Sequence, residues 1–325
     1  MRYFRREYKN KIYTFIYDKA MKYIFIEDME ELETDSIVHA RVRSVNKELG
    51  YSFVDLGKLG DGFIDCELKS GEEYIFNIKK KPECSKGYVL DFDIRIKSEN
   101  MIVFPNSKKF YENDYEKITD MPTLILNKNA SPCELTSDAI DISSEYKKLL
   151  EIKSTLPIPK IVFRSDSKSD RFIEGYNIGF GNRDDAIMAF NDTEGLVDGK
   201  FTNDDGSIII DSKDHFTFID FNSDGKGVYY RRELNHLDKN KKLLKKALEI
   251  IELRNIEGMI LIDLLKMNKY KRLIDELDDI LKNKFVFHDI TKLGILELTR
   301  KKDGRTRISQ DNIGEIKSIL YGEIE

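Results

Sequence analysis

Two aspartates that end apolar runs are the residues of this chain best suited to chemistry. Residues 215–219 (HFTFI) lead into Asp220, residues 259–262 (MILI) lead into Asp263, and the segment between them has a helical pattern. Parallel strands joined by a helical crossover are usually neighbours, so residues at their carboxyl ends come close together. Two carboxylates held that close repel one another, and a hard cation offsets the repulsion. The pattern therefore predicts a carboxylate pair that holds Mg²⁺.

Asn222 adds a polar group to this pair. It lies two residues after Asp220, so both side chains share one face while the chain stays extended. Its amide could hold a water molecule or a phosphate oxygen. A plainer interpretation is that strands of α/β proteins often end in Asp because Asp suits the following turn. That interpretation covers a single aspartate, whereas the pair together with Asn222 favours a metal site.

Length and composition set the class of protein. With 325 residues, of which 40% are hydrophobic, the chain can form two or three domains with ordinary cores. The lack of a long apolar run argues against a transmembrane helix. The basic N-terminus lacks the apolar core and cleavage site of a signal peptide. We therefore expect a cytoplasmic protein.

Cysteine and histidine offer no metal motif. Cys66, Cys84 and Cys133 are widely spaced and form no CxxC pair, so neither a disulfide framework nor a zinc site is indicated. The histidines show no HxxxH spacing. They are expected to be structural or exposed.

Charge is distributed unevenly along the chain. The net charge is −5, but residues 225–310 contain 21 Lys and Arg against 13 Asp and Glu. A basic C-terminal half that faces a polyanion fits this asymmetry. Lysines that only solvate helices explain it equally well.

Residues 36–105 contain about five short strands separated by Gly-rich turns, the pattern of a small closed barrel of the OB type. Such barrels bind single strands by stacking bases on aromatic side chains next to basic ones. Phe53, Phe63 and Lys86 are the candidates for this role. The alternative for both phenylalanines is a place in the barrel core.

The remaining segments give less specific signals. Residues 1–35 suggest a hairpin, and a helix near 143–153 has Ser143 or Ser144 as its N-cap. Arg164 and Ser165 follow a short strand, where they either clasp a phosphate or form a surface turn.

Beyond residue 200 the pattern predicts regular structure. It consists of a hairpin ending at Asp220, a helix reaching about Asn255, a second helix over 270–281, two closing strands and a basic tail after Thr299.

The segments FIDFNSDG and NIEGMILIDLLKM resemble motifs of the ribonuclease E/G family of bacterial endoribonucleases. The family motifs have the forms ID-hydrophobic-NSG and GG-hydrophobic-IDFIDM, which match residues 219–223 and 257–263 here, and LGILELTRKK is similar to a later family segment. The resemblance implies that Asp220, Asn222 and Asp263 are catalytic. It also implies that the two aspartates bind Mg²⁺, with Mn²⁺ as a substitute.

The resemblance continues more weakly toward the N-terminus. The segment from Val38 to Ile64 is similar to the family's S-one-type RNA-binding domain, which implies RNA contacts at Phe53, Phe63 and Lys86. The segment IVFRSD is similar to the part of the family that binds an RNA 5′-monophosphate. It implies that role for Arg164 and Ser165, with Lys284 in the place of a further arginine.

The implied fold is a multidomain α+β and α/β chain. We expect an OB-fold barrel, a DNase I-like α/β catalytic domain, and reduced RNase H-like and 5′-sensor parts. The expected regions are an N-terminal hairpin joining the core (1–35), the barrel (36–105), a shortened 5′-sensor and connecting region (106–200), and the catalytic domain (201–325).

Three departures from the family stand out. The segment after Arg164 is short, the turn after Asn222 has the additional Asp224, and the zinc-link motif CPxCxG is absent. We therefore expect a shortened member that binds no zinc and forms, if anything, a homodimer without a zinc bridge.

The expected function is Mg²⁺-dependent endonucleolytic cleavage of single-stranded, A/U-rich RNA in mRNA decay or RNA processing. A non-catalytic protein that binds mRNA or ribosomal RNA precursors is the first alternative. Another metal phosphoesterase is the second, but it explains the carboxylates without explaining the barrel.

Overall fold

The protein, described as a computed structural model, divides into two compact units. One, the sheet unit, comprises Met1–Met29 and Lys168–Glu325, and the other, the barrel unit, comprises Glu30–Ser167. The predicted region 106–200 thus contributes to both units. The structure describes residues 1–82, 87–98, 100–105, 123–127, 129–153, 157–193, 199–212, 216–223, 232–281, 284–301 and 303–322.

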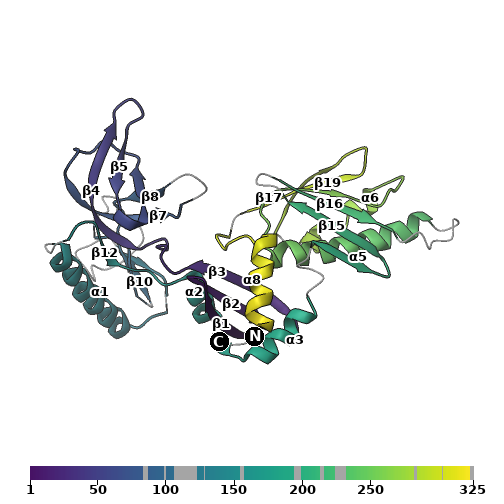
Figure 1. The fold of residues 1–325 in the computed structure, drawn as a ribbon, viewed down its shortest axis with the longest axis horizontal. Coiled ribbons are helices and arrows are strands. Elements are labelled where there is room, and N and C mark those ends of the chain that lie inside the picture. Colours follow the sequence, from purple (N-terminus) through teal and green to yellow (C-terminus); the bar gives the residue numbers. More distant parts are fainter. Residues whose placement is uncertain are drawn as a thin grey trace. The chain divides into compact units, whose positions relative to one another are not determined.

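The barrel unit contains the closed five-stranded, OB-like barrel that the sequence predicts (Figure 1). The strands follow the order β4-β5-β6-β8-β7, and β7 pairs with β4 to close the barrel. Alternate side chains of these strands point inward to a core that includes Val54, Phe76 and Leu90. The strands are β4 (Ile37–Asn46), β5 (Tyr51–Asp55), β6 (Asp61–Ile64), β7 (Glu73–Lys80) and β8 (Tyr88–Asp91), with the 3-10 helix η1 (Gly57–Leu59) between β5 and β6.

A small sheet and one long helix complete the barrel unit. The strand β12 (Lys160–Phe163) adds to β4, while β9 (Ile96–Lys97), β10 (Met101–Val103) and β11 (Thr123–Ile125) form a separate sheet. The helix α1 (Pro132–Lys153) shares a hydrophobic cluster with that sheet.

The predicted start of this helix near Ser143 is wrong. The helix begins at Pro132, where Ser131 Oγ accepts from the backbone N–H of Glu134 (3.3 Å) and the Glu134 carboxylate accepts from the backbone N–H of Ser131 (2.7 Å). This reciprocal capping satisfies donors at the helix start. Ser143 and Ser144 therefore lie inside the helix and do not cap it.

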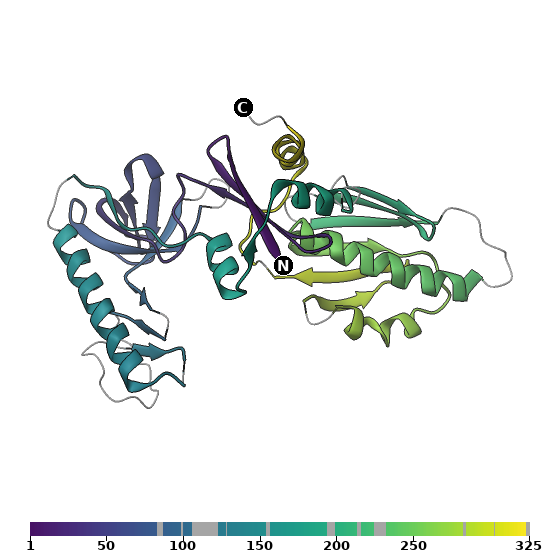
Figure 2. The same cartoon turned by 90° about the horizontal axis from the view of Figure 1, so that it is seen from below.

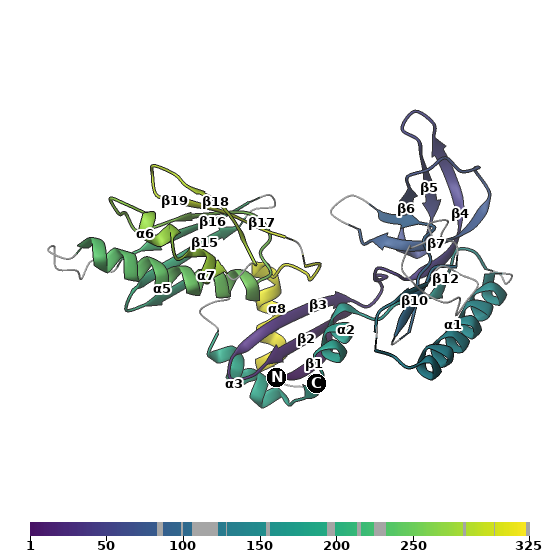
Figure 3. The same cartoon turned by 180° about the vertical axis from the view of Figure 1, so that it is seen from behind.

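The N-terminal strands belong to the sheet unit. The strands β2 (Lys11–Tyr17) and β3 (Met21–Asp28) form the predicted hairpin, and β1 (Arg2–Tyr8) and β13 (Gly179–Phe180) extend it to a sheet of order β13-β1-β2-β3 (Figure 3). The helices α2 (Lys168–Gly175) and α3 (Arg183–Asn191) flank this sheet.

A six-stranded sheet forms the larger part of the sheet unit. Its order is β14-β15-β16-β17-β19-β18, and of the described pairings within this sheet only β16–β17 is parallel. The hairpin β15–β16, the crossover helix and the two closing strands all agree with the sequence-based prediction. The strands are β14 (Lys200–Asn203), β15 (Gly206–Ser212), β16 (Phe216–Asn222), β17 (Gly258–Asp263), β18 (Val286–Ile290) and β19 (Ile295–Arg300).

The helix α5 (Arg232–Leu253) lies along one face of the six-stranded sheet (Figure 2). Leu243, Leu244 and Ala247 of this helix are fully buried, in one core with Ile219 and Ile262 of the sheet. Buried residues of β2 and β3 join the same core. The opposite face of the six-stranded sheet is not covered by α5, and it carries exposed apolar side chains such as Ile209, Phe216 and Met259 as well as Asp220 and Asp263.

Two predictions for the C-terminal part are wrong. The single helix predicted over 270–281 is two short helices, α6 (Lys271–Ile274) and α7 (Leu277–Leu281). The predicted basic tail packs against the unit, since Ile308 is fully buried, and it leads into the helix α8 (Gln310–Tyr321). In the described part of the chain, no helix is long and apolar enough to cross a membrane.

Candidate active site

Asp220 and Asp263 occupy the same position on neighbouring parallel strands. The register pairs Ile219 with Ile262 and Asp220 with Asp263. Adjacent strands lie about 4.8 Å apart, so the two carboxyl groups are within reach of a single ion. Both isoleucines are fully buried toward α5. Because side chains alternate along a strand, the two aspartates point to the opposite, open face.

The electrostatics of the pair are unfavourable without a cation. Burial, and then the negative charge of Asp220, raise the pKa of Asp263 above its ordinary value. Among the described residues, no cationic side chain pairs with Asp263. A divalent ion would relieve the repulsion between the two carboxylates.

Asn222 lies at the end of β16, next to the pair. Its Nδ2 donates to Asp220 Oδ2 at 2.7 Å, which holds that carboxylate in one orientation. Gly206 lies beside it on β15 with a φ of +147°, and a Cβ there would come within 2.2 Å of the carbonyl oxygen of Asn222. Glycine at this position allows β15 to approach the residue that orients Asp220.

The chain that follows Asp263 is fixed by α5. The amide of the fully buried Asn240 accepts from Leu265 N and donates to Leu265 O, both at 2.9 Å. His236 Nδ1 hydrogen-bonds to Lys266 O at 2.8 Å. These contacts hold the chain just beyond Asp263. They were not predicted, although an asparagine within the apolar stripe of a helix is a signal for such a buried contact.

The donor set fits magnesium better than zinc. Magnesium is usually held by one or two carboxylates and keeps several waters, whereas structural zinc requires four nitrogen or sulfur ligands. Within the described ranges, no group of three or more His, Cys, Asp and Glu side chains gathers for a metal. Asp220 and Asp263 would therefore supply two oxygen ligands and leave positions for water and substrate.

The predicted RNA-binding aromatics lie on the outside of the barrel. Phe53 on β5 pairs directly with Phe63 on β6, and neither belongs to the buried core. Ser52 and Val54, which alternate with Phe53, are fully buried, so Phe53 points away from the barrel interior. Tyr51 packs against both phenylalanines, with ring centroids 5.4 and 6.4 Å apart.

Tyr51 was missed by the sequence analysis. Its position two residues before Phe53 on the same strand was the available signal. The third predicted contact, Lys86, lies outside the described residues.

The three predicted 5′-phosphate residues are divided between the units. In the barrel unit, Arg164 Nη1 donates to Glu31 O at 3.1 Å, and the backbone N–H of Ser165 donates to Ser36 Oγ at 3.0 Å. In the sheet unit, Lys284 forms an ion pair with Glu252 at 2.5 Å. Lys284 is therefore already compensated by a carboxylate.

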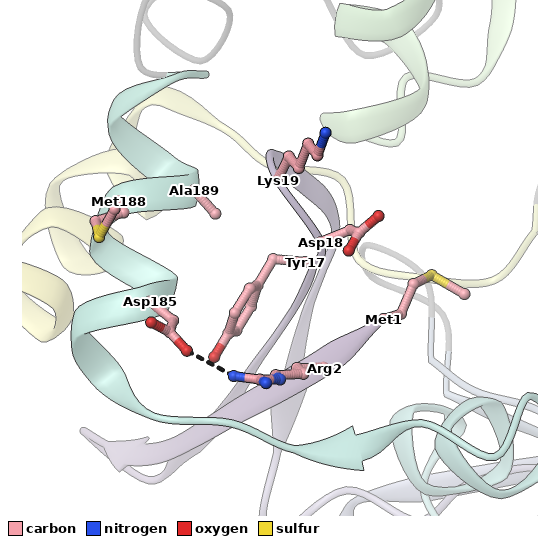
Figure 4. A pocket seen from close by; sticks show the side chains of 8 residues that line it. All are labelled: Met1, Arg2, Tyr17, Asp18, Lys19, Asp185, Met188 and Ala189. Carbon is pink, nitrogen blue, oxygen red and sulfur yellow. Dashed lines mark hydrogen bonds and ion pairs between the residues drawn. The ribbon is translucent and has the colours of Figure 1, made fainter.

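A pocket of about 480 Å³ lies beside α3 in the sheet unit (Figure 4). Its lining includes Tyr17 and the ion pair between Arg2 and Asp185, whose atoms are 2.9 Å apart. None of the predicted site residues lines this pocket. Its opposite charges compensate each other, so the pocket does not compete with the carboxylate pair as the candidate site.

Comparison with known proteins finds a family match over the segment that contains the candidate site. Residues 200–303, which contain Asp220, Asn222 and Asp263, match the Ribonuclease E/G family. Over this segment the chain is similar to the ribonuclease E/G family. Ribonuclease G of Haemophilus influenzae is 21% identical over 307 residues, which cover 76% of this chain and 62% of the relative. The chain therefore spans less than two thirds of the length of this ribonuclease E/G relative.

Proposed function

We propose that the protein is an Mg²⁺-dependent endoribonuclease that cleaves single-stranded RNA in RNA processing or mRNA decay. The observation that carries the proposal is the in-register pair of Asp220 and Asp263, with Asn222 bonded to Asp220, within the segment that matches the Ribonuclease E/G family. The OB-like barrel supports a single-stranded substrate.

In the proposed reaction, Asp220 and Asp263 would hold the metal at the ends of β16 and β17. When bound there, Mg²⁺ would lower the pKa of a water molecule and offset charge on the scissile phosphate. The Asn222 amide nitrogen holds the Asp220 carboxylate in one orientation through its hydrogen bond. The amide oxygen of Asn222 would then be available to water or substrate. This arrangement requires no histidine as a general base.

The other regions have supporting roles in this proposal. The six-stranded sheet with its helices would be the DNase I-like catalytic part, and the four-stranded sheet a reduced RNase H-like part. Phe53 and Phe63, with Lys86, would hold the RNA strand by stacking and charge. Arg164 and Ser165 would contact the 5′ end as a reduced sensor. A/U-rich substrates, a cytoplasmic location and a homodimer without zinc belong to the same proposal.

A side-by-side assay tests the reaction class. Purified full-length chain is incubated with single-stranded RNA, single-stranded DNA and a generic phosphodiester, each with millimolar Mg²⁺, Mn²⁺ or EDTA. The proposal expects internal cleavage of RNA only, abolished by EDTA. RNA binding without turnover at either metal would instead identify a non-catalytic RNA-binding protein. Cleavage of all three substrates would indicate a general phosphoesterase.

A further inference from the structure

A buried arginine that pairs with no described carboxylate follows the end of α5, at the end of β17 opposite to the carboxylate pair. Arg254 follows the helix and is only 3% exposed. Its Nε and Nη1 are buried and have no hydrogen-bond partner in the part of the chain that the structure describes. A guanidinium does not lose its proton in proteins, so it cannot escape the cost of burial by becoming neutral. A buried charge of this kind normally has an anionic partner.

Two described carboxylates of this part of the sheet unit, Asp303 and Glu252, are engaged with other cations. Asp303 accepts from Arg300 at 3.1 Å and from Arg305 at 2.7 Å. Glu252 is paired with Lys284. The local charges are therefore mostly positive, and no described carboxylate bonds to Arg254.

A second arginine, Arg307, lies close to Arg254 at the end of α5. The backbone N–H of Ile308 donates to Arg254 O at 2.9 Å, which fixes Arg307 beside the end of the helix. The like charge of Arg307 adds to burial in lowering the pKa of Arg254. Arg307 donates to Ser212 Oγ, which is hydrogen-bonded at 2.6 Å to Thr217 Oγ1. The Arg307 guanidinium thus lies at the Ser212–Thr217 pair of β15 and β16, close enough to Arg254 for its charge to act on that side chain.

We propose that a small tetrahedral oxyanion, with inorganic phosphate as the type ligand, binds between Arg254 and Arg307, with Ser212 completing the donor set. Guanidinium groups suit this ligand because their parallel N–H groups match two oxygens of a phosphate. Because Arg254 is almost completely buried, a small free ion suits it better than a phosphate group within a nucleic-acid chain. The bound ion links the β15–β16 hairpin to the segment that precedes α8. This site is separate from the carboxylate pair and goes beyond the proposed nuclease function.

Thermal unfolding of the full chain in phosphate and in chloride, at equal ionic strength and pH, tests this site. A ligand that binds only the folded state raises the unfolding midpoint with the logarithm of its concentration. We expect the wild type to gain several degrees in phosphate over chloride. Arg254→Met should lose this gain, and Arg254→Lys should keep only part of it. Arg6→Met, which removes an exposed arginine from the same unit, should keep all of it.

Two results would overturn the proposal. The first is an equal midpoint for the wild type in both salts, a comparison that does not depend on any variant folding. The second is an equal phosphate gain in Arg254→Met and wild type, which would indicate general salt exclusion from the protein surface. A short single-stranded RNA is the third arm of the experiment. If RNA raises the midpoint and inorganic phosphate does not, the ligand is a phosphate of a nucleic acid and the free ion is excluded.

Discussion

Asp220 and Asp263 are directly paired in the parallel ladder of β16 and β17, on the face that α5 leaves open. Burial and then the neighbouring charge of Asp220 raise the pKa of Asp263, as expected for two carboxylates held close together. The hydrogen bond from Asn222 then fixes one of the two carboxylates. This relationship is the basis of the proposed metal-dependent reaction.

Replacing Asn222 with alanine should lower the RNA cleavage rate. The variant loses the 2.7 Å hydrogen bond to Asp220 Oδ2, so that carboxylate no longer has a fixed orientation. Loss of such an orienting contact typically costs about 10- to 100-fold. The rate is measured under single-turnover conditions, with Ser207→Ala as the control because Ser207 is paired with Asn222 on β15. Equal rates for Asn222→Ala and wild type would contradict this role.

Replacing Tyr51 or Phe53 with alanine should weaken binding of single-stranded RNA. Both rings lie on the outer surface of the barrel, and each stacked base contributes about 1–3 kcal/mol by alanine substitution. We therefore expect Kd to rise about tenfold for each variant, measured by fluorescence anisotropy in the presence of EDTA. Leu126→Ala removes an exposed apolar side chain of the same unit outside the barrel and should leave Kd unchanged. An unchanged Kd for both aromatic variants would exclude this surface as the RNA site.

The Asp303 carboxylate should make unfolding of the sheet unit sensitive to acid. Burial alone would raise its pKa, but hydrogen bonds from Arg305 and the charges of Arg305 and Arg300 outweigh burial and lower it. A carboxyl group whose pKa is lower in the folded state stabilises that state fully at pH values above its unfolded-state pKa of about 3.9. This stabilisation is lost as the pH falls through the folded-state pKa. The difference in unfolding free energy between wild type and Asp303→Asn should therefore shrink from pH 7 to pH 3. Urea denaturation measures it, and a difference that stays constant over this range would refute the linkage.

The helix α8 should be part of the core of the sheet unit. Ile316 is fully buried in that core, and truncation of such a residue costs about 2–5 kcal/mol. Ile316→Ala should therefore lower the unfolding free energy by this amount, whereas the exposed Ser318→Ala should change it by less than about 0.5 kcal/mol. Equal unfolding free energies for the two variants in urea denaturation would mean that α8 does not support the core.

The sequence predicted the parts of the fold that local patterns determine. Alternating apolar residues gave the β15–β16 hairpin, and the apolar runs ending at Asp220 and Asp263 gave their parallel pairing. The short strands and glycines between residues 36 and 105 gave the closed barrel. In each case the hydrophobic period and the turn residues agree with the observed strands.

The missed features depend on contacts between distant segments. Arg305 looked like part of a charged tail, but its guanidinium lies over the rings of Tyr23 and Phe25, at 5.1 and 5.8 Å from their centroids. Asn240 was not among the residues that the helical pattern singled out, but its amide is bonded to the chain beyond Asp263. The start of α1 was placed too late because two serines inside the helix resembled caps. A single sequence shows the residue types of such contacts without their partners.

The cleavage rates of Asp220→Asn and Asp263→Asn, measured with single-stranded RNA at saturating Mg²⁺, test the proposed metal site most directly. Each substitution keeps the size of the side chain but removes a carboxylate ligand, so each should lower the rate by more than about a hundredfold. Asp211→Asn, on the neighbouring strand β15, is the matched control and should cleave at nearly the wild-type rate. Undiminished Mg²⁺-dependent cleavage by either member of the pair would contradict the assignment of Asp220 and Asp263 as the metal site.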